Sequence, residues 1–236
     1  MSKFNCDICH DTGWIKVKKN GNEYLKKCDC VKNDLLIKKS ETSNIPKRFI
    51  GMELKGYYPV EGYDSQKKVK LLVKEFINDF PAVEKGILFQ GNTGVGKTRL
   101  LSTIATELFN KNSQLDIFFV DWNEVIRIMR SGESHTFRDF PQINMLIARM
   151  TNTDLLLFDE IGASEPSRWV QDNIYYIINN RYNNNKITLF ASNYLDKGVD
   201  GKPTLQDRIG DRIRSRIFAM AKSVIIKGPD YRQIYE

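Results

Sequence analysis

The chain has 236 residues, of which 41% are hydrophobic and 28% are charged, and its formal net charge is +7. No apolar run approaches the roughly 20 residues that a membrane-spanning helix needs, which excludes such a helix. The first residues lack the apolar core of a signal peptide, so we expect a cytoplasmic location. The positive charge is compatible with a polyanionic partner such as nucleic acid, or with an ordinary basic surface.

The N-terminal segment, residues 1–32, is predicted to be a small zinc-binding module. It holds all four cysteines of the chain, Cys6, Cys9, Cys28 and Cys30. They flank "WIKVKKNGNEYLKK", which predicts a hairpin with Asn20 and Gly21 in its turn. Four thiolates at two nearby chain reversals suit tetrahedral Zn²⁺. His10 could replace one ligand, and "CDICH" also fits a haem-attachment pattern. A local disulfide pair is a further alternative, though unexpected in the cytoplasm.

The rest of the chain predicts an α/β fold. Residues 33–45 form an expected linker, and residues 65–80 carry apolar side chains at helical spacing. Short, continuously apolar runs then alternate with helical segments. The five expected strands are residues 86–90, 116–120, 154–159, 187–192 and 223–227. Because such strands are typical of parallel sheets, we expect one domain over residues 46–236 with a five-stranded parallel sheet covered on both faces.

The sequence "GNTGVGKT" matches the P-loop pattern G-x-x-x-x-G-K-[ST], between an expected strand and an expected helix. Its glycines allow successive backbone N–H groups to converge on phosphate oxygens. Lys97 would reach the β- and γ-phosphates, and the Thr98 hydroxyl would bind Mg²⁺. The predicted ATP-binding residues are Gly91, Asn92, Thr93, Gly94, Val95, Gly96, Lys97 and Thr98.

The run "LLLFDE" is an apolar strand that ends in two acids, which is the Walker B arrangement. We expect Asp159 to hold Mg²⁺ and Glu160 to orient or deprotonate the attacking water. In P-loop ATPases with an additional strand, the strand beside Walker B carries a polar sensor. Asn193, after "TLFAS", is the candidate for that sensor, with an ordinary strand-end turn as the alternative.

These motifs together resemble the AAA+ ATPases of the bacterial and phage helicase-loader family, the DnaC/DnaI-like proteins. Transposition ATPases of the IstB type are close relatives of that family. The resemblance covers roughly residues 44–234 and rests on "IPKRF", "GNTGVGKT", "LLLFDEIGASEPSRW", "ASN", "RIGDRIRSRI" and "KGPDYR". It implies an additional-strand AAA+ domain. Some family members carry a zinc-bearing N-terminal module that docks on the replicative helicase. The module of this chain is short and could instead bind DNA or an initiator.

The resemblance also implies an arginine finger that reaches the nucleotide of a neighbouring subunit. Arg208, Arg212 and Arg216 recur every four residues, which predicts one face of a helix. Arg212 best matches the finger position and Arg216 is the alternate, since planar guanidinium donors suit phosphoryl oxygens. A solvated basic helix face is the structural alternative. Arg232 is a candidate second nucleotide sensor.

By the same resemblance, two segments would contact single-stranded DNA. They are Phe137 and Arg138, and Ser167, Arg168 and Trp169. Aromatic side chains stack on bases without a sequence preference, and arginines follow phosphates. Alternatively, Trp169 is a packed residue at the start of a helix whose isoleucines are core.

The resemblance implies a cytoplasmic ATPase that loads the replicative helicase onto single-stranded DNA, with ATP, Mg²⁺ and Zn²⁺ as cofactors. Its partners would be the helicase, single-stranded DNA and further copies of itself, with no membrane. An IstB-type transposition helper is the first alternative. A small-molecule kinase and a non-catalytic nucleotide switch are alternatives from other classes, and the few residues after the last expected strand disfavour a DnaA-type initiator.

Overall fold

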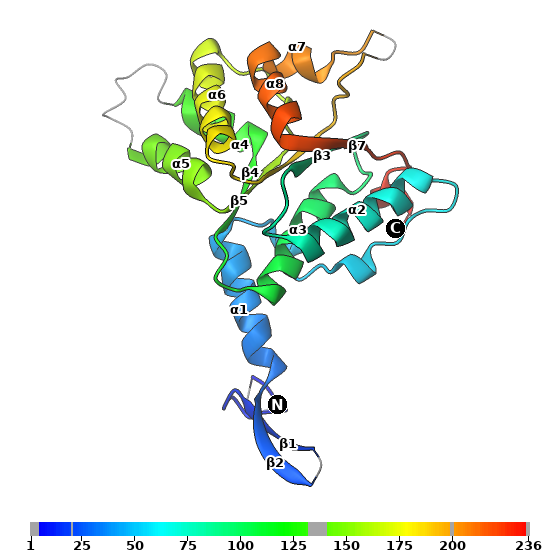
Figure 1. Ribbon diagram of the computed structural model, residues 1–236, viewed down its shortest axis with the longest axis vertical. Helices are drawn as coiled ribbons and strands as arrows, with labels where there is room; N and C mark the ends of the chain where they lie inside the picture. The colour runs from blue at the N-terminus through cyan, green and yellow to red at the C-terminus, as the bar shows by residue number, and fades with distance from the viewer. Residues whose placement is uncertain (1–4, 20, 132–140, 199–200, 235–236) are drawn as a thin grey trace.

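The five expected strands form one parallel sheet in the order β4-β5-β6-β3-β7 (Figure 1). The computed structural model describes residues 5–19, 21–131, 141–198 and 201–234. The strands are β3 (Gly86–Gln90), β4 (Ile117–Asp121), β5 (Leu155–Asp159), β6 (Thr188–Ser192) and β7 (Ala221–Ile225). The last strand begins two residues earlier than expected, because the preceding helix ends at Met220. The predicted five-stranded parallel sheet is confirmed, with β6 as the additional strand between β3 and β5.

Helices cover both faces of this sheet, as predicted (Figure 1). Successive strand residues point to opposite layers, so Ile87 and Phe89 join one core while Leu88 joins the other. The first layer contains α2 (Asp64–Asp79), at the position of the helix expected over 65–80, and α3 (Lys97–Lys111). The second layer contains α4 (Trp122–Arg130), α5 (Pro141–Asn152), α6 (Arg168–Asn183), α7 (Leu205–Ile209) and α8 (Asp211–Met220).

A helix occupies most of the segment expected to be a linker. α1 (Asp29–Thr42) runs from the cysteine segment to the sheet, and only Ser40 of its residues is buried. Beyond its end the chain is fixed to the edge strand β4, where the N–H of Phe119 donates to the carbonyl of Ser43 (2.8 Å). Two short 3-10 helices follow, η1 (Lys47–Phe49) and η2 (Leu54–Gly56).

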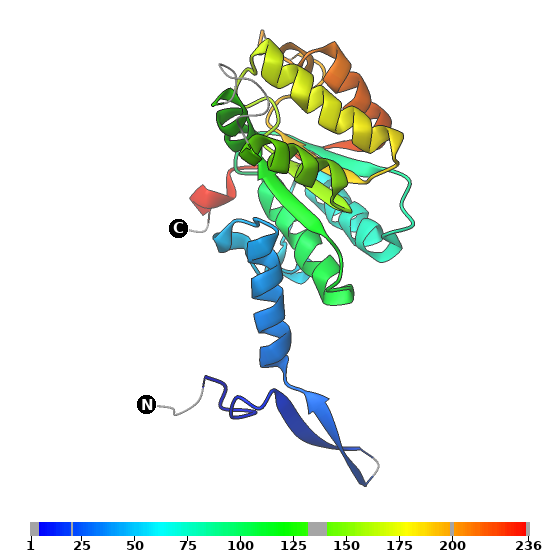
Figure 2. The ribbon, with the colours of Figure 1, turned by 90° about the vertical axis from the view of Figure 1, so that its left-hand side faces the viewer.

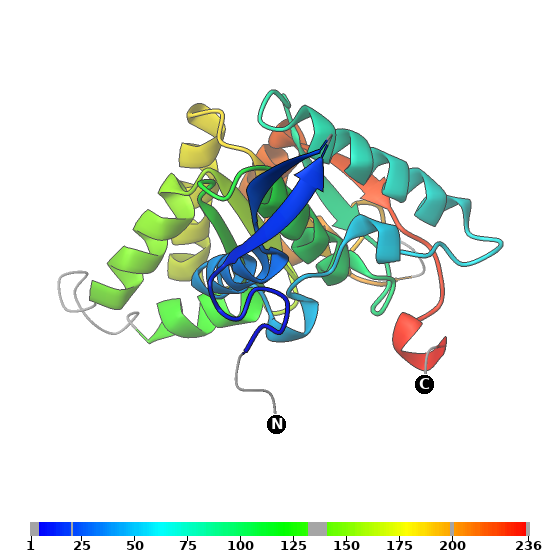
Figure 3. The ribbon, with the colours of Figure 1, turned by 90° about the horizontal axis from the view of Figure 1, so that it is seen from below.

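The expected hairpin is present at the far end of α1 from the sheet (Figure 2). β1 (Trp14–Lys19) pairs antiparallel with β2 (Asn22–Lys27). Gly21 adopts a positive φ of 81° in the turn, whereas Asn20 lies outside the described residues. At the other end of the chain, α9 (Tyr231–Ile234) lies outside both helix layers (Figure 3). Within the described part of the chain, no helix has both the length and the apolar content to cross a membrane.

Candidate nucleotide and metal sites

The P-loop turns sharply between the end of β3 and the start of α3. Gly91 and Gly96 have φ of 148° and 95°, and a Cβ at Gly91 would lie 2.2 Å from the carbonyl oxygen of Ile226. Glycine is therefore required where the loop passes this neighbouring backbone. α3 begins at Lys97, and the first N–H groups of a helix have no partner within the helix. The loop thus supplies the backbone geometry that an anionic phosphate group needs.

Lys97 is folded back into this loop. Its side-chain Nζ donates to the carbonyl oxygens of Gly91 (2.8 Å) and Asn92 (2.7 Å), and the residue is 7% exposed. Burial lowers the pKa of Lys97 to about 8. Among the described residues no carboxylate accepts a hydrogen bond from this ammonium group, so the pocket would favour an anionic ligand.

A cavity of about 320 Å³ lies against the P-loop and collects most of the predicted catalytic and nucleotide-binding residues. Those in its lining are Thr93, Gly94, Gly96, Lys97, Thr98, Asp159, Glu160, Asn193 and Arg232. The residues that complete the lining were not predicted from the sequence, namely Arg48, Phe49, Met52, Tyr57, Arg99 and Tyr231. Arg48 and Phe49 belong to "IPKRF", a motif that carries the family resemblance but does not by itself predict a pocket role for these side chains.

Asp159 ends β5 almost completely buried, at 3% exposure. Its carboxylate accepts hydrogen bonds from the Thr98 side chain and from the N–H of Glu160 (3.0 Å). Burial nevertheless raises the pKa of Asp159 to about 6. A carboxylate and a hydroxyl oxygen in contact are the donor types that Mg²⁺ prefers, so Thr98 and Asp159 fit the ion expected at this position.

Glu160 begins the turn after β5 with a positive φ of 53°. Its carboxylate accepts from the side-chain amide of Asn123 (3.5 Å), a contact that was not predicted from the sequence. Asn193 lines the same cavity after β6, and the neighbouring Ser192 hydroxyl donates to the carbonyl of Ile161 (2.7 Å). The signal for Asn123 was its place two residues after β4, at the same edge of the sheet as the Walker B acids.

The three predicted arginines do not share one helix, which corrects that expectation. Gly210, with φ 80° and ψ 159°, separates α7 from α8, so that Arg208 lies on α7 and the other two lie on α8. Arg212 lies over the Tyr175 ring (3.9 Å) and its side chain is 69% exposed. Arg216 donates to the side chain of Asn179 (2.8 Å). Neither Arg212 nor Arg216 lines the cavity of its own chain.

Arg232, the candidate second sensor, reaches the cavity from α9. The N–H of the preceding Tyr231 donates to the P-loop carbonyl of Gly94 (3.0 Å), which holds α9 beside the loop. The Arg232 guanidinium lies 4.0 Å from the carboxylate of Asp230. The C-terminal segment is therefore attached to the P-loop itself.

The segment expected to touch DNA begins α6. Ser167 caps this helix by accepting from the N–H of Val170 (3.3 Å), and Arg168 is exposed. Trp169 packs partly against the core, as the structural alternative predicts, and it also lines a groove between α5 and α6, while its contact with DNA stays a prediction. Phe137 and Arg138 lie outside the described residues.

The four cysteines converge at the base of the hairpin, with their sulfur atoms all within 4.8 Å of one another. The Sγ atoms of Cys6 and Cys28 are 3.8 Å apart, and those of Cys9 and Cys30 are 3.5 Å apart. These separations exceed a disulfide bond of about 2.05 Å. They match the roughly 3.8 Å between ligands of a tetrahedral zinc–thiolate centre with bonds of about 2.3 Å. The cluster fits zinc, and His10 is not a member of it among the described residues.

Comparisons with known proteins place the chain among bacterial replication ATPases. The family description of the bacterial DnaA ATPase domain matches residues 63–221. The phage-like element PBSX protein XkdC of Bacillus subtilis is 25% identical over 98% of this chain and 85% of its own length. The replicative helicase loader DnaC of Buchnera aphidicola subsp. Baizongia pistaciae is 30% identical over 66% of this chain.

This alignment spans 61% of the length of that DnaC protein. A crystal structure of the DnaC helicase loader, 28% identical, superposes with a TM-score of 0.64 over 77% of this chain and all of that one. The resemblance to helicase-loader ATPases is therefore confirmed, together with its additional-strand AAA+ fold. The matched region covers most of the chain and contains the P-loop and the Walker B acids. The chain therefore belongs to the family of the bacterial DnaA ATPase domain.

Proposed function

We propose that this protein is an ATP-dependent replication factor that loads the replicative helicase onto single-stranded DNA. The observation that carries the proposal is the P-loop cavity, in which Lys97, Asp159 and Asn193 meet beside the strand ends. The similarity to proteins named helicase loaders supports the rest of it.

ATP would place its phosphates on the N–H groups of residues 91–98, with Lys97 exchanging its two carbonyl partners for phosphate oxygens. Thr98 and Asp159 would hold the Mg²⁺, which supplies charge neutralisation for the phosphates. The aromatic and apolar side of the cavity, with Phe49, Met52 and Tyr57, suits the base.

Hydrolysis requires a water in line with the γ-phosphate, and Glu160 is the group that would orient or deprotonate it. Asn193, directly after β6, lines the same cavity. A kinase that transfers phosphate to a bound metabolite has less need of the second acid, so this pair favours hydrolysis. A non-catalytic switch would bind nucleotide without depending on Glu160.

ATP would also control oligomerisation. Arg212 is exposed and does not line the cavity of its own chain, so it could act on the nucleotide of a neighbouring subunit. Hydrolysis by an isolated subunit should consequently be slow. Arg168 and Trp169 would contact single-stranded DNA at the start of α6, together with the predicted Phe137 and Arg138.

The cysteine module, residues 1–32 in the proposed domain division, would bind Zn²⁺ and dock on the helicase. Its position at the far end of α1 exposes the hairpin to a partner (Figure 2). An IstB-type transposition helper would use the same ATPase site but would prefer duplex DNA and a transposase. The preference for single-stranded or duplex DNA therefore distinguishes the two proposals.

The test measures ATP hydrolysis with and without single-stranded or duplex DNA, with molar mass by light scattering in the same samples. We expect single-stranded DNA to stimulate turnover, turnover per chain to rise with protein concentration, and Arg212→Ala to abolish the rise. Stronger stimulation by duplex would favour the transposition helper. ATP turnover that does not depend on DNA, on protein concentration or on Arg212 would reject the loader proposal.

A further inference from the structure

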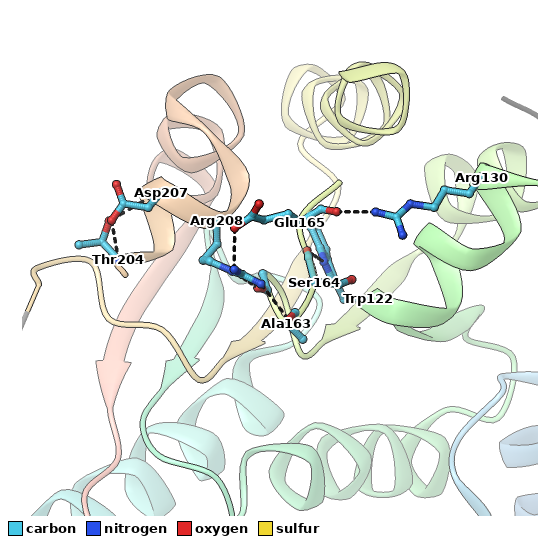
Figure 4. Close-up of polar contacts among 9 residues, drawn as sticks. Trp122, Arg130, Ala163, Ser164, Glu165, Thr204, Asp207 and Arg208 are labelled. Atoms are coloured by element: carbon cyan, nitrogen blue, oxygen red, sulfur yellow. Dashed lines mark hydrogen bonds and ion pairs between the residues drawn. The ribbon is translucent and has the colours of Figure 1, made fainter. Parts of the chain in front are cut away.

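The loop that follows the Walker B acids, residues 161–165, is held by side chains from two other elements (Figure 4). Arg208 of α7 donates to the carbonyl oxygens of Gly162 (2.7 Å) and Ala163 (2.9 Å). Its guanidinium also pairs with the carboxylate of Glu165 (2.8 Å). The Arg208 side chain is only 17% exposed, so its two carbonyl contacts are partly shielded from water, whereas the Glu165 side chain is 71% exposed.

α4 holds the next two carbonyls of the same loop. The indole Nε1 of Trp122 donates to the carbonyl of Ser164 (2.8 Å), and Arg130 donates to the carbonyl of Glu165 (2.8 Å) (Figure 4). Four consecutive carbonyls, from Gly162 to Glu165, thus each accept a side-chain hydrogen bond from α4 or α7. The start of the loop is also tied by its backbone, since the N–H of Ile161 donates to Ala191 (2.8 Å) and that of Ala163 donates to Glu160 (3.0 Å). From Gly162 to Glu165 the loop has no regular secondary structure, and the side chains of α4 and α7 hold its carbonyls.

The position of Glu160 depends on that path. A non-glycine residue with φ of 53° is unfavourable unless its surroundings impose the conformation, and Glu160 directly precedes the held loop. Gly162 also has a positive φ, 84°, and a Cβ there would lie 3.0 Å from the Cβ of Arg208. Arg208 therefore packs tightly on the turn that aims the Glu160 carboxylate.

The short helix α7, which carries Arg208, is itself held at both ends. Thr204 and Asp207 form a capping box at the start of α7 (Figure 4). The carbonyl of Ile209 accepts from the side chain of Gln171 (2.9 Å), which ties the end of α7 to α6. The Arg208 side chain also covers the ring of Tyr194 (5.1 Å), the residue after Asn193. One arginine thus contacts the turns that follow both β5 and β6.

We propose that Arg208 is a positioning residue that sets Glu160 for water activation through the 161–165 loop. This inference rests on the proposed ATPase function. Arg208 does not line the nucleotide cavity, so it acts on turnover and not on nucleotide affinity. Its planar fork serves three acceptors at once, which a lysine ammonium on a flexible chain cannot reproduce.

The experiment compares the full chain with Arg208→Ala, Arg208→Lys and Glu165→Gln. It measures kcat, nucleotide affinity by a fluorescent ATP analogue, and the indole N–H resonance of Trp122, assigned with Trp122→Phe. We expect Arg208→Ala to lower kcat by about 10- to 100-fold, the scale of a small misplacement, with affinity within about twofold. Arg208→Lys should recover only part of kcat. Glu165→Gln should lose less than Arg208→Ala, because both carbonyl contacts remain.

The Trp122 resonance should shift in Arg208→Ala, because its acceptor Ser164 lies between two residues that Arg208 holds. An active wild-type protein whose kcat is unchanged in both Arg208 variants would overturn the proposal. So would a loss of affinity as large as the loss of kcat. If Arg208→Ala does not fold, full activity in Arg208→Lys would overturn it equally. Wild-type protein that binds but never hydrolyses ATP would reject the proposed function as well.

Discussion

Replacing Asp159 by asparagine should stabilise the nucleotide-free protein while it removes magnesium-dependent ATP binding. The carboxylate is 3% exposed and burial raises its pKa from 3.8 to about 6. Each pKa unit corresponds to about 1.4 kcal/mol, so the ionised form costs the folded state roughly 3 kcal/mol at neutral pH. Asparagine avoids this cost and keeps an oxygen that can accept from the Glu160 N–H.

The pH dependence of the gain follows from the direction of the shift. Because the pKa of Asp159 is higher in the folded than in the unfolded state, wild-type stability falls as pH rises from about 4 to about 6. The asparagine side chain does not titrate and has no such dependence. The advantage of Asp159→Asn should therefore be small near pH 4 and reach about 1–3 kcal/mol at pH 7, or about 2–10 °C in Tm for a chain of this size.

Thermal unfolding at a series of pH values in a chelator measures this gain. Glu160→Gln is the matched control, since it removes a neighbouring carboxylate that is less buried. Adding ATP and Mg²⁺ should reverse the order, because only the wild type gains stability from the ligand. A variant that is less stable than wild type at pH 7, or a gain that does not change with pH, would refute the reasoning.

Three further outcomes are expected. ATP turnover should fall as pH drops through about 6, because Asp159 takes up a proton. A higher Mg²⁺ concentration should move this fall to lower pH, because the cation binds the ionised carboxylate. A pH–rate profile at two magnesium concentrations checks both effects. The purified chain should contain about one Zn²⁺, measured by elemental analysis, and Cys28→Ser should lose it while Ser40→Ala keeps it. Arg181→Met should lower the free energy of unfolding by about 3–5 kcal/mol in denaturant titrations, because four carbonyl groups and the Thr188 hydroxyl lose their donor, whereas the exposed Arg168→Met should cost under about 0.5 kcal/mol.

The parts of the fold that were predictable are those in which local sequence and tertiary position agree. The strands are continuously apolar because both faces of the sheet are covered, so β3 and β5 could be located to within a residue. The P-loop and the Walker B acids follow those strands directly. Since the carboxyl ends of parallel strands share one edge, Lys97 and Asp159 had to lie close together.

Other features could not be predicted, because local sequence carries no signal for them or because their contacts are distant in sequence. α1 has almost no buried face, so no apolar stripe distinguishes its helix from a charged linker. Arg181 lies in "NNRYNNNK", which has the composition of a solvated segment, yet it is fully buried and its guanidinium donates to Met150 of α5 and Thr188 of β6. Gly210 could have indicated the break between α7 and α8, but the four-residue spacing of the arginines predicted one continuous helix.

The two charged residues that were easiest to predict, Lys97 and Asp159, both lie where burial disfavours the charged form. Lys97 has its pKa lowered and Asp159 has its pKa raised, both by burial, and Lys97 donates to carbonyls of the P-loop. Two opposite charges held in one pocket without a mutual hydrogen bond are poorly compensated. Phosphate oxygens would compensate the ammonium, and a divalent cation would compensate the carboxylate. The same burial that lowers the stability of the nucleotide-free protein thus makes the pocket selective for a ligand that brings both charges. Asp159→Asn is therefore expected to lose magnesium-dependent ATP binding and to gain folding stability.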